Sequence, residues 1–71
     1  MNYGQQIRDQ RDKLGIKQGD LAARVGMAQD WLSSREVGRV EMTQVEAMGC
    51  SAAIEQIMVE RKAAYEELQA I

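Results

Sequence analysis

Four polar residues with hydrogen-bonding side chains lie close together in the first half of the chain. They are Gln29, Asp30, Ser33 and Ser34. At helical spacing their side chains lie on other faces of the helix than Leu32, so they stay free to contact another molecule. An amide such as that of Gln29 matches the acceptor and donor on the major-groove edge of adenine, and a carboxylate accepts from cytosine. The pattern fits base recognition, and it fits equally a helical hairpin with a solvated outer face.

Two short helices joined by a tight turn are needed to position these side chains. Gly26 follows the apolar residues Leu21 and Val25 and marks a turn with positive φ. Ala22, four residues earlier, is small enough for the second helix to cross closely over the first. We therefore expect helices over residues 18–25 and 28–37, preceded by a helix over 3–14 that ends at Gly15.

Residues 5 to 43 resemble the Cro/repressor-type (XRE-like) helix-turn-helix family of phage and bacterial transcriptional regulators. The segments IRDQRDKLGIKQGDLAARVG and WLSSREVGR carry the resemblance. The matching positions are Arg11, Gly15, Gln18, Leu21, Ala22, Gly26, Leu32, Glu36 and Gly38. The resemblance implies an all-α, lambda-repressor-like helix-turn-helix domain of four to five helices with a long C-terminal helix.

The resemblance also implies roles for individual residues. Gln18 is expected to bind a backbone phosphate and to brace Gln29, which reads a base. Asp30 and Ser34 occupy the other reading positions, and Ser33 lies beside them. Arg11 and Glu36 are expected to form a partly buried ion pair between the first helix and the end of the reading helix. Further phosphate contacts are expected from the basic residues Arg39, Lys17, Arg8 and Lys13.

Two residues depart from the family pattern. Arg35 stands where relatives usually carry an apolar anchor, so either its methylenes cover the core or its guanidinium reaches a phosphate. Trp31 stands where a small polar residue is common. We expect Trp31 to be partly exposed near the DNA. It could lie in the core, donate a hydrogen bond to a phosphate, or contact a thymine methyl group. Both residues are therefore candidate positioning contacts.

Charge divides unevenly along the chain. The net charge is -2. Residues 1 to 39 hold seven Lys or Arg against five Asp or Glu, a balance of +2, and residues 40 to 71 hold two against six, a balance of -4. Local positive charge suffices to neutralise phosphates, and an acidic second half weakens the attraction. We expect modest affinity for each protomer.

The second half is expected to hold two further helices. Thr43 and Glu46 form a T-x-x-E capping box that opens one of them. Residues 49–51 could lie inside one continuous helix, but we favour a break there. Residues 1–50 would then form the helix-turn-helix domain and residues 51–71 a long helix within the same compact unit. An apolar seam along this helix, interrupted by Arg61, predicts dimerisation or packing on its own domain. The seam consists of Ile54, Ile57, Met58, Tyr65 and Leu68.

Several classes of function lack the residues that they need. The chain has no histidine and a single cysteine, Cys50, so no familiar zinc site and no histidine-dependent nucleophile pair can form. We expect no enzyme, no cofactor, no metal and no small-molecule ligand. Cys50 is expected to be a buried apolar residue. No secretory or long apolar segment is expected, which favours the cytoplasm of a bacterial or phage-infected cell.

The expected function is that of a sequence-specific regulator, a Cro-like phage repressor that binds a pseudopalindromic operator as a homodimer. Half-sites should lie about 34 Å apart or a multiple of that distance. An antitoxin and a restriction-modification controller protein share the motif and stay open. A helical adaptor that binds proteins and not DNA is the alternative from another class, favoured by the net acidity.

Overall fold

Four helices make up the fold over residues 2–70. The computed structural model describes residues 2–70, and none of these lies in a strand. The helices are α1 (Tyr3–Lys13), α2 (Gln18–Arg24), α3 (Gln29–Glu36) and α4 (Gln44–Gln69). The expected all-α class is confirmed, and the helix count falls at the lower end of the expected four to five.

The helix ends follow from local side-chain and glycine chemistry. The glycines just after the first three helices, Gly15, Gly26 and Gly38, have φ values of 65°, 77° and 84°. A glycine takes up such a left-handed conformation without a Cβ clash, which lets the chain turn sharply after each helix. Thr43 and Glu46 form the expected capping box at the start of α4. Lys17 makes no side-chain cap at α2, as its residue type predicts.

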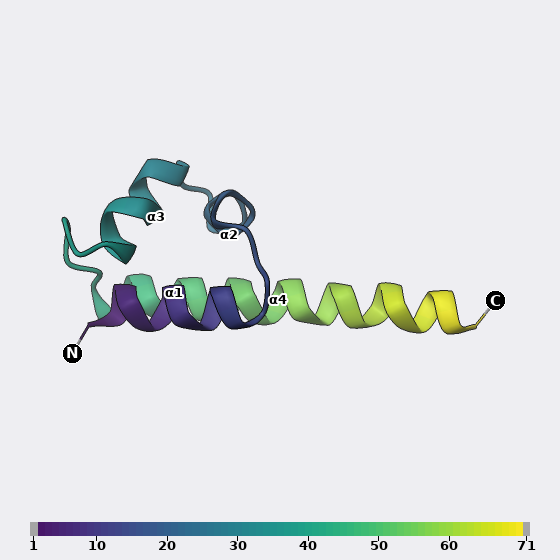
Figure 1. The fold of residues 1–71 in the computed structure, drawn as a ribbon. Helices are drawn as coiled ribbons and strands as arrows, with labels where there is room; N and C mark the ends of the chain where they lie inside the picture. Colours follow the sequence, from purple (N-terminus) through teal and green to yellow (C-terminus); the bar gives the residue numbers. More distant parts are fainter. Residues whose placement is uncertain (1, 71) are drawn as a thin grey trace.

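The helices form two layers. α1 and α4 run side by side in the same direction, and α2 and α3 lie across them on one side (Figure 1). The overall extents are 46 × 22 × 18 Å. The long dimension belongs to α4, which projects beyond the other three helices at its C-terminal end (Figure 1). The molecule therefore has a packed body, residues 2–60, and a single-helix tail, residues 61–70.

The core lies between the two layers. Its buried residues come from all four helices and the connections between them: Ile7, Ile16, Leu21, Ala22, Leu32, Met42, Ala47, Cys50, Ala53 and Ile54. The Cys50 side chain is buried as expected, and this burial raises the pKa of its thiol. The thiol is consequently held neutral and serves as packing.

The expected break near residues 49–51 is wrong, because α4 continues through Gly49 without interruption. Gly49 is exposed, and a Cβ placed on it would meet nothing within 4 Å. A helical glycine costs only about 1 kcal/mol relative to alanine. Buried core residues lie on both sides of the expected boundary, and their burial outweighs that cost. They are Ala47 and Cys50 before it and Ala53 and Ile54 after it.

α1 and α3 approach each other closely at Gly4. A Cβ built on this residue would lie 2.0 Å from the backbone oxygen of Arg35, closer than any two such atoms can come. Gly4 is buried within α1, where glycine costs helix stability. The absence of a side chain there is what lets the C-terminal half of α3 rest on α1. Nothing in the sequence pattern marked this glycine as a contact point.

Candidate nucleic-acid interface

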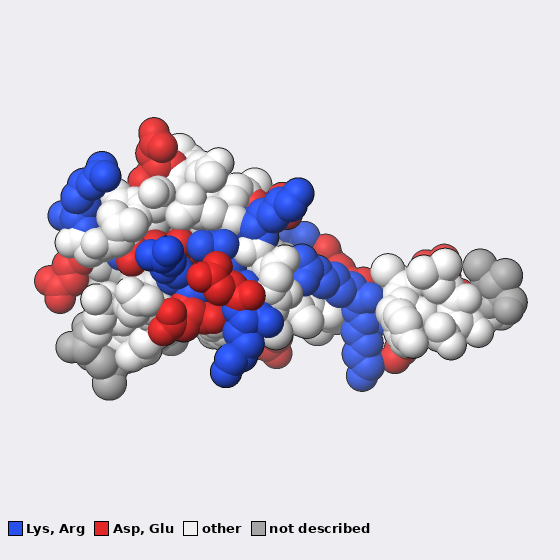
Figure 2. All heavy atoms as spheres, viewed as in Figure 1, with Lys and Arg blue, Asp and Glu red and all other residues white. Residues whose placement is uncertain are grey.

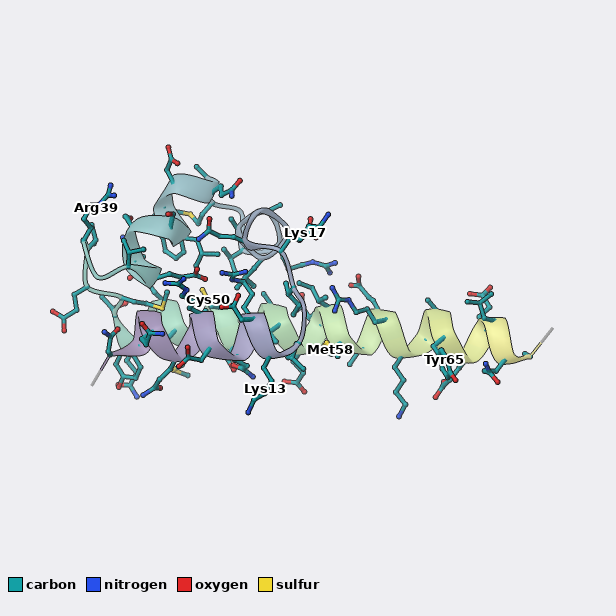
Figure 3. The ribbon with its side chains drawn as sticks, viewed as in Figure 1. Lys13, Lys17, Arg39, Cys50, Met58 and Tyr65 are labelled. Carbon is teal, nitrogen blue, oxygen red and sulfur yellow. The ribbon has the colours of Figure 1, made fainter. Side chains whose placement is uncertain are left out.

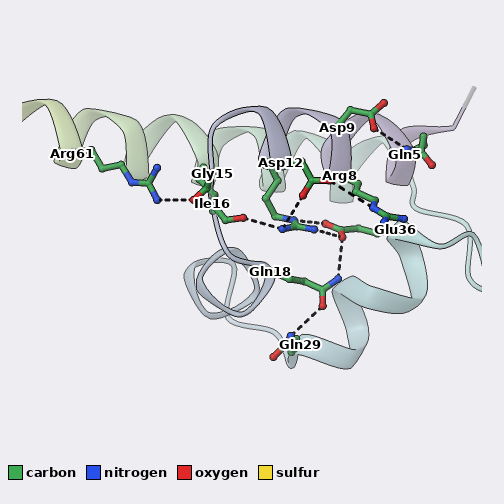
Figure 4. A network of polar contacts seen from close by, with 11 residues as sticks. Gln5, Arg8, Asp9, Asp12, Gly15, Ile16, Gln18, Gln29, Glu36 and Arg61 are labelled. Carbon is green, nitrogen blue, oxygen red and sulfur yellow. Dashed lines mark hydrogen bonds and ion pairs between the residues drawn. The ribbon is translucent and has the colours of Figure 1, made fainter.

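A buried ion pair joins α1 to the end of α3. The Nε and Nη2 groups of Arg11 donate to the two carboxylate oxygens of Glu36 at 2.9 and 2.8 Å, and Nη1 donates to the backbone oxygen of Ile16 at 2.9 Å (Figure 4). Arg11 is 9% exposed and Glu36 is 2% exposed. The hydrogen bond to Glu36 raises the pKa of Arg11. Two parallel charge-assisted bonds fix the guanidinium and the carboxylate in one geometry.

Two glutamines extend this pair from the core to the surface. Gln18 donates to Glu36 Oε1 at 2.9 Å, and Gln29 donates through Nε2 to Gln18 Oε1 at 3.1 Å (Figure 4). An ionised carboxylate only accepts, so the nitrogen of Gln18 must face Glu36 and its oxygen must face Gln29. Gln29 in turn must donate, which fixes the orientation of its amide. One N–H and the carbonyl oxygen of Gln29 remain for another molecule.

Gly19 makes room for the Gln29 amide. A Cβ on Gly19 would lie 3.3 Å from Gln29 Oε1, tighter than an ordinary contact. This glycine lies in the first turn of α2, where its only evident cost is backbone entropy. The start of α2 is therefore shaped around the side chain at the start of α3.

The outer face of α3 is polar. Gln29 and Asp30 are exposed, and Ser33 and Ser34 are partly exposed. Leu32 and Glu36 turn to the interior. The hydroxyl of Ser34 donates to the backbone oxygen of Trp31 at 2.9 Å, which leaves its oxygen able to accept. The structure thus brings the four expected base-reading residues together at one surface.

Arg35 is held inside the body and does not extend outward. Its guanidinium lies 4.3 Å from the centre of the Trp31 ring and donates to the Trp31 backbone oxygen at 3.3 Å. It also donates to both carboxylate oxygens of Glu46 on α4, at 3.2 and 3.3 Å. Of the two roles expected for Arg35, these contacts favour the anchor over the phosphate contact, since the guanidinium already has a carboxylate partner. Stacking and ion pairing let Arg35 anchor α3 in place of an apolar residue.

Trp31 and Glu46 complete this anchor. Trp31 is partly buried and packs against the core, with Arg35 over its ring. The backbone N–H of Thr43 lowers the pKa of Glu46, and the hydrogen bonds from Arg35 lower it further. Glu46 thereby closes the first turn of α4 and fixes α3 with the same carboxylate.

The basic residues expected to touch phosphates lie in different places. Arg39 and Lys17 are exposed at the two ends of the layer formed by α2 and α3, whereas Lys13 points away from that layer on the far side of α1 (Figure 3). Arg8 lies 3.8 Å from Asp12 within α1. Positive and negative groups are mixed over the body (Figure 2). Lys13 is consequently misplaced for a contact made by α3, while Lys17 and Arg39 flank it.

The expected dimerisation residues divide between the body and the tail. Ile54 is 1% exposed within the core and is closed to a second chain, which corrects its assignment to an interface. Ile57 and Met58 are partly buried against the core. Tyr65 and Leu68 are 62% and 68% exposed. Only the last two lie fully on the surface.

Two cross-helix contacts of α4 escaped the sequence patterns. Arg61 donates to the backbone oxygens of Leu14 and Gly15 at 2.9 and 3.4 Å and so caps the C-terminal end of α1 (Figure 4). Arg24 forms a two-pronged ion pair with Glu60, with Nη2 to Oε1 at 2.6 Å. This pair raises the pKa of Arg24 and lowers that of Glu60. Together they tie α1 and α2 to the place where the tail begins.

Comparison of the chain with protein-family models, with curated proteins and with solved structures gives no significant match. Within residues 2–70, no helix combines the length and the apolar character that crossing a bilayer requires. The described residues also contain no group of three or more His, Cys, Asp or Glu side chains that could hold a metal ion.

Proposed function

We propose that this chain is a sequence-specific DNA-binding regulator in which α2 and α3 act as a lambda-repressor-like helix-turn-helix. One observation carries the proposal: the chain of hydrogen bonds from Arg11 through Glu36 and Gln18 to Gln29. It links a buried ion pair to an exposed amide at the start of α3. A glutamine that merely lies on a solvent-exposed helix face needs no such support, because water would satisfy its hydrogen bonds equally well.

The held amide has the chemistry of base recognition. With one N–H and one carbonyl oxygen left over, Gln29 can bind the N7 acceptor and the N6 donor of adenine together. A fixed orientation lowers the entropy cost of forming both bonds. Asp30, Ser33 and Ser34 add acceptors and hydroxyl donors on the same face. We assign these four residues to base edges in the major groove.

Lys17 and Arg39 supply the phosphate contacts. Both are exposed and flank the layer that contains α3 (Figure 3). Such contacts set the register of a protein on the duplex without reading its sequence. Asp30 repels phosphate when the register is wrong and so sharpens the choice of site. Gln18 supports Gln29 from the inner side and is a further candidate for a contact with a phosphate of the DNA backbone.

A regulator of this kind would act as a homodimer on a pseudopalindromic operator, as a Cro-like phage repressor does, inside a bacterial or phage-infected cell. Occupation of promoter DNA would then block transcription. An antitoxin or a restriction-modification controller would use the same surface on DNA. The genes beside this one separate these three roles.

Selection of bound sequences from a random duplex pool at physiological salt tests the proposal, followed by mobility-shift titration on the selected site. Gln29→Ala is expected to weaken binding about 5- to 150-fold, since one bidentate base contact is worth about 1–3 kcal/mol. Gln10→Ala, at an exposed amide on α1, is the matched control and should leave affinity unchanged. Affinity should also fall steeply with salt. A pool that yields no motif, or a flat salt response, would overturn the assignment.

A protein-binding adaptor that lacks DNA binding is the second candidate. The observation that favours it is the pair of exposed carboxylates, Asp20 on α2 and Asp30 on α3, within the layer that would face the duplex. Asp20→Asn distinguishes the two functions, because Asp20 is not among the residues assigned to bases. This variant should bind the selected DNA more tightly if the layer of α2 and α3 faces phosphates, and an adaptor would gain no DNA affinity beyond a weak, sequence-independent increase.

A further inference from the structure

The tail of α4 leaves an apolar face uncovered. Tyr65 and Leu68 follow Ile54 and Met58 at spacings of three, four and seven residues, so they continue the face that packs on the body. Within residues 2–70, no other helix lies beside the C-terminal end of α4 for that face to meet (Figure 1). Tyr65 and Leu68 are consequently 62% and 68% exposed, and both project from the isolated part of the helix.

The order of basic and acidic residues along the tail is complementary to the same order read in the opposite direction. Two basic residues, Arg61 and Lys62, precede two acidic residues, Glu66 and Glu67, by about one helical turn. Two such segments side by side in the same direction would place like charges together. In opposite directions, each basic pair would face an acidic pair. In the described part of the chain, the side chains of Lys62, Glu66 and Glu67 form no ion pair that would explain this order.

We propose that the tail pairs with the tail of a second copy of this chain in an antiparallel arrangement centred near Ala64. In this register Lys62 lies opposite the partner's Glu66, and Arg61 lies opposite the partner's Glu67. Arg61 spends two of its five donors on the end of α1, so others remain for that carboxylate. In the same register Leu68 lies within one helical turn of the partly buried edge that Ile57 and Met58 form at the base of the other tail, and the two copies of Tyr65 lie beside each other near the axis.

This arrangement has two-fold symmetry, since each contact occurs twice with the roles exchanged. It relates the two copies of α3 by the same axis. The link to an inverted-repeat operator rests on the proposed DNA binding, whereas the pairing itself does not. The pairing is therefore tested without DNA, and its failure would leave the base-reading role of Gln29 to be judged on its own assay.

Sedimentation equilibrium of the full chain over a wide concentration range measures the pairing. Tyr65→Ser with Leu68→Ser is expected to raise the dimer Kd roughly a hundredfold or more, because two apolar side chains lose their cover. Val45→Ser with Val59→Ser is the matched control, since these residues are 79% and 61% exposed on another side of α4. A chain that stays monomeric at millimolar concentration would overturn the proposal. So would dimerisation that the control abolishes and the Tyr65 and Leu68 variant retains.

Charge exchange tests the direction of pairing. Lys62→Glu and Glu66→Lys should each raise the Kd roughly three- to tenfold by setting like charges opposite one another. An equimolar mixture of the two variants should form heterodimers of wild-type strength, a result that contacts within one helix cannot produce. The chain that carries both exchanges should dimerise as strongly as the wild type. In a parallel pair, this double variant would dimerise no more strongly than either single variant. Failure of either the mixture or the double exchange to recover would overturn the antiparallel register.

Discussion

The body and the tail of this molecule reverse the usual placement of polar and apolar groups in opposite ways. In the body, the charged side chains of Arg11 and Glu36 are buried. In the tail, the apolar side chains of Tyr65 and Leu68 are exposed. The buried charges have complete hydrogen-bonding partners within the chain, and no buried polar side-chain atom in residues 2–70 is left unsatisfied. The exposed apolar groups have no such partner.

This difference separates two kinds of positioning. A buried ion pair contributes little net stability, but it fixes geometry, and here it fixes the support of Gln29. An exposed apolar face contributes nothing to the monomer and favours association. The body thus holds one surface in a fixed geometry, and in the proposed dimer the tail is covered by a second copy of the chain. Variants in the two regions should consequently act on different measurements.

The largest effect on folding is expected from Glu36→Ala. It leaves the buried Arg11 guanidinium without its carboxylate, which costs about 3–5 kcal/mol. For a domain of this size each kcal/mol lowers Tm by about 4–8 °C. Thermal unfolding followed by circular dichroism measures the change, with Glu41→Ala at an exposed side chain as the control. Equal Tm values for the two variants would show that the pair does not hold the body together.

Two positions on one seam of α4 compare the body and the tail directly. Ile54→Ala removes a side chain that is 1% exposed and should cost about 2–4 kcal/mol of unfolding free energy. Leu68→Ala, at 68% exposure, should change it by no more than about 0.5 kcal/mol in dilute monomer. Urea unfolding at low concentration measures both. A large loss from Leu68→Ala in the monomer would mean that the tail folds back onto the body.

A smaller loss is expected from Gly4→Ala. The new methyl group would overlap the backbone of Arg35, so α3 must move away from α1 at a cost of about 1–3 kcal/mol. Gly49→Ala is the control within α4, where the added methyl meets nothing and should stabilise the helix by about 0.5–1 kcal/mol. Opposite signs for the two substitutions in urea unfolding are the expected result. Stabilisation by both would remove the close approach from the account of how α3 is positioned.

Much of the body could be predicted from the sequence because its signals are local. Turn glycines such as Gly26 and the capping box of Thr43 and Glu46 act through their nearest neighbours, and the structure shows them where the pattern places them. The prediction of a break near Gly49 was wrong because it, too, rested on a local signal. The local preference of Gly49 favours a break, and only the core contacts of Cys50 and Ile54 keep the helix whole.

The contacts that the sequence did not reveal join residues on different helices. Arg61 reaches the end of α1, and Arg35 on α3 reaches Glu46 on α4. Neither has a spacing that marks its partner, since the separation depends on how the helices pack. Arg11 and Glu36 are 25 residues apart, and they were expected as a pair only through the family resemblance.

The smallest expected effect concerns acid stability and rests on Glu46. Its pKa lies below the ordinary value of 4.5 in the folded chain, because Thr43 and Arg35 donate to the ionised carboxylate. Folding therefore favours the charged form, so this contribution is fully present above about pH 4.5 and is lost as the pH falls through the lowered value. Glu46→Gln keeps the cap but removes the charge, and it should flatten the acid side of the stability curve. Glu66→Gln in the tail, measured in dilute monomer, is the control. If both variants kept the wild-type acid limb, Arg35 would have to anchor α3 through the Trp31 ring alone.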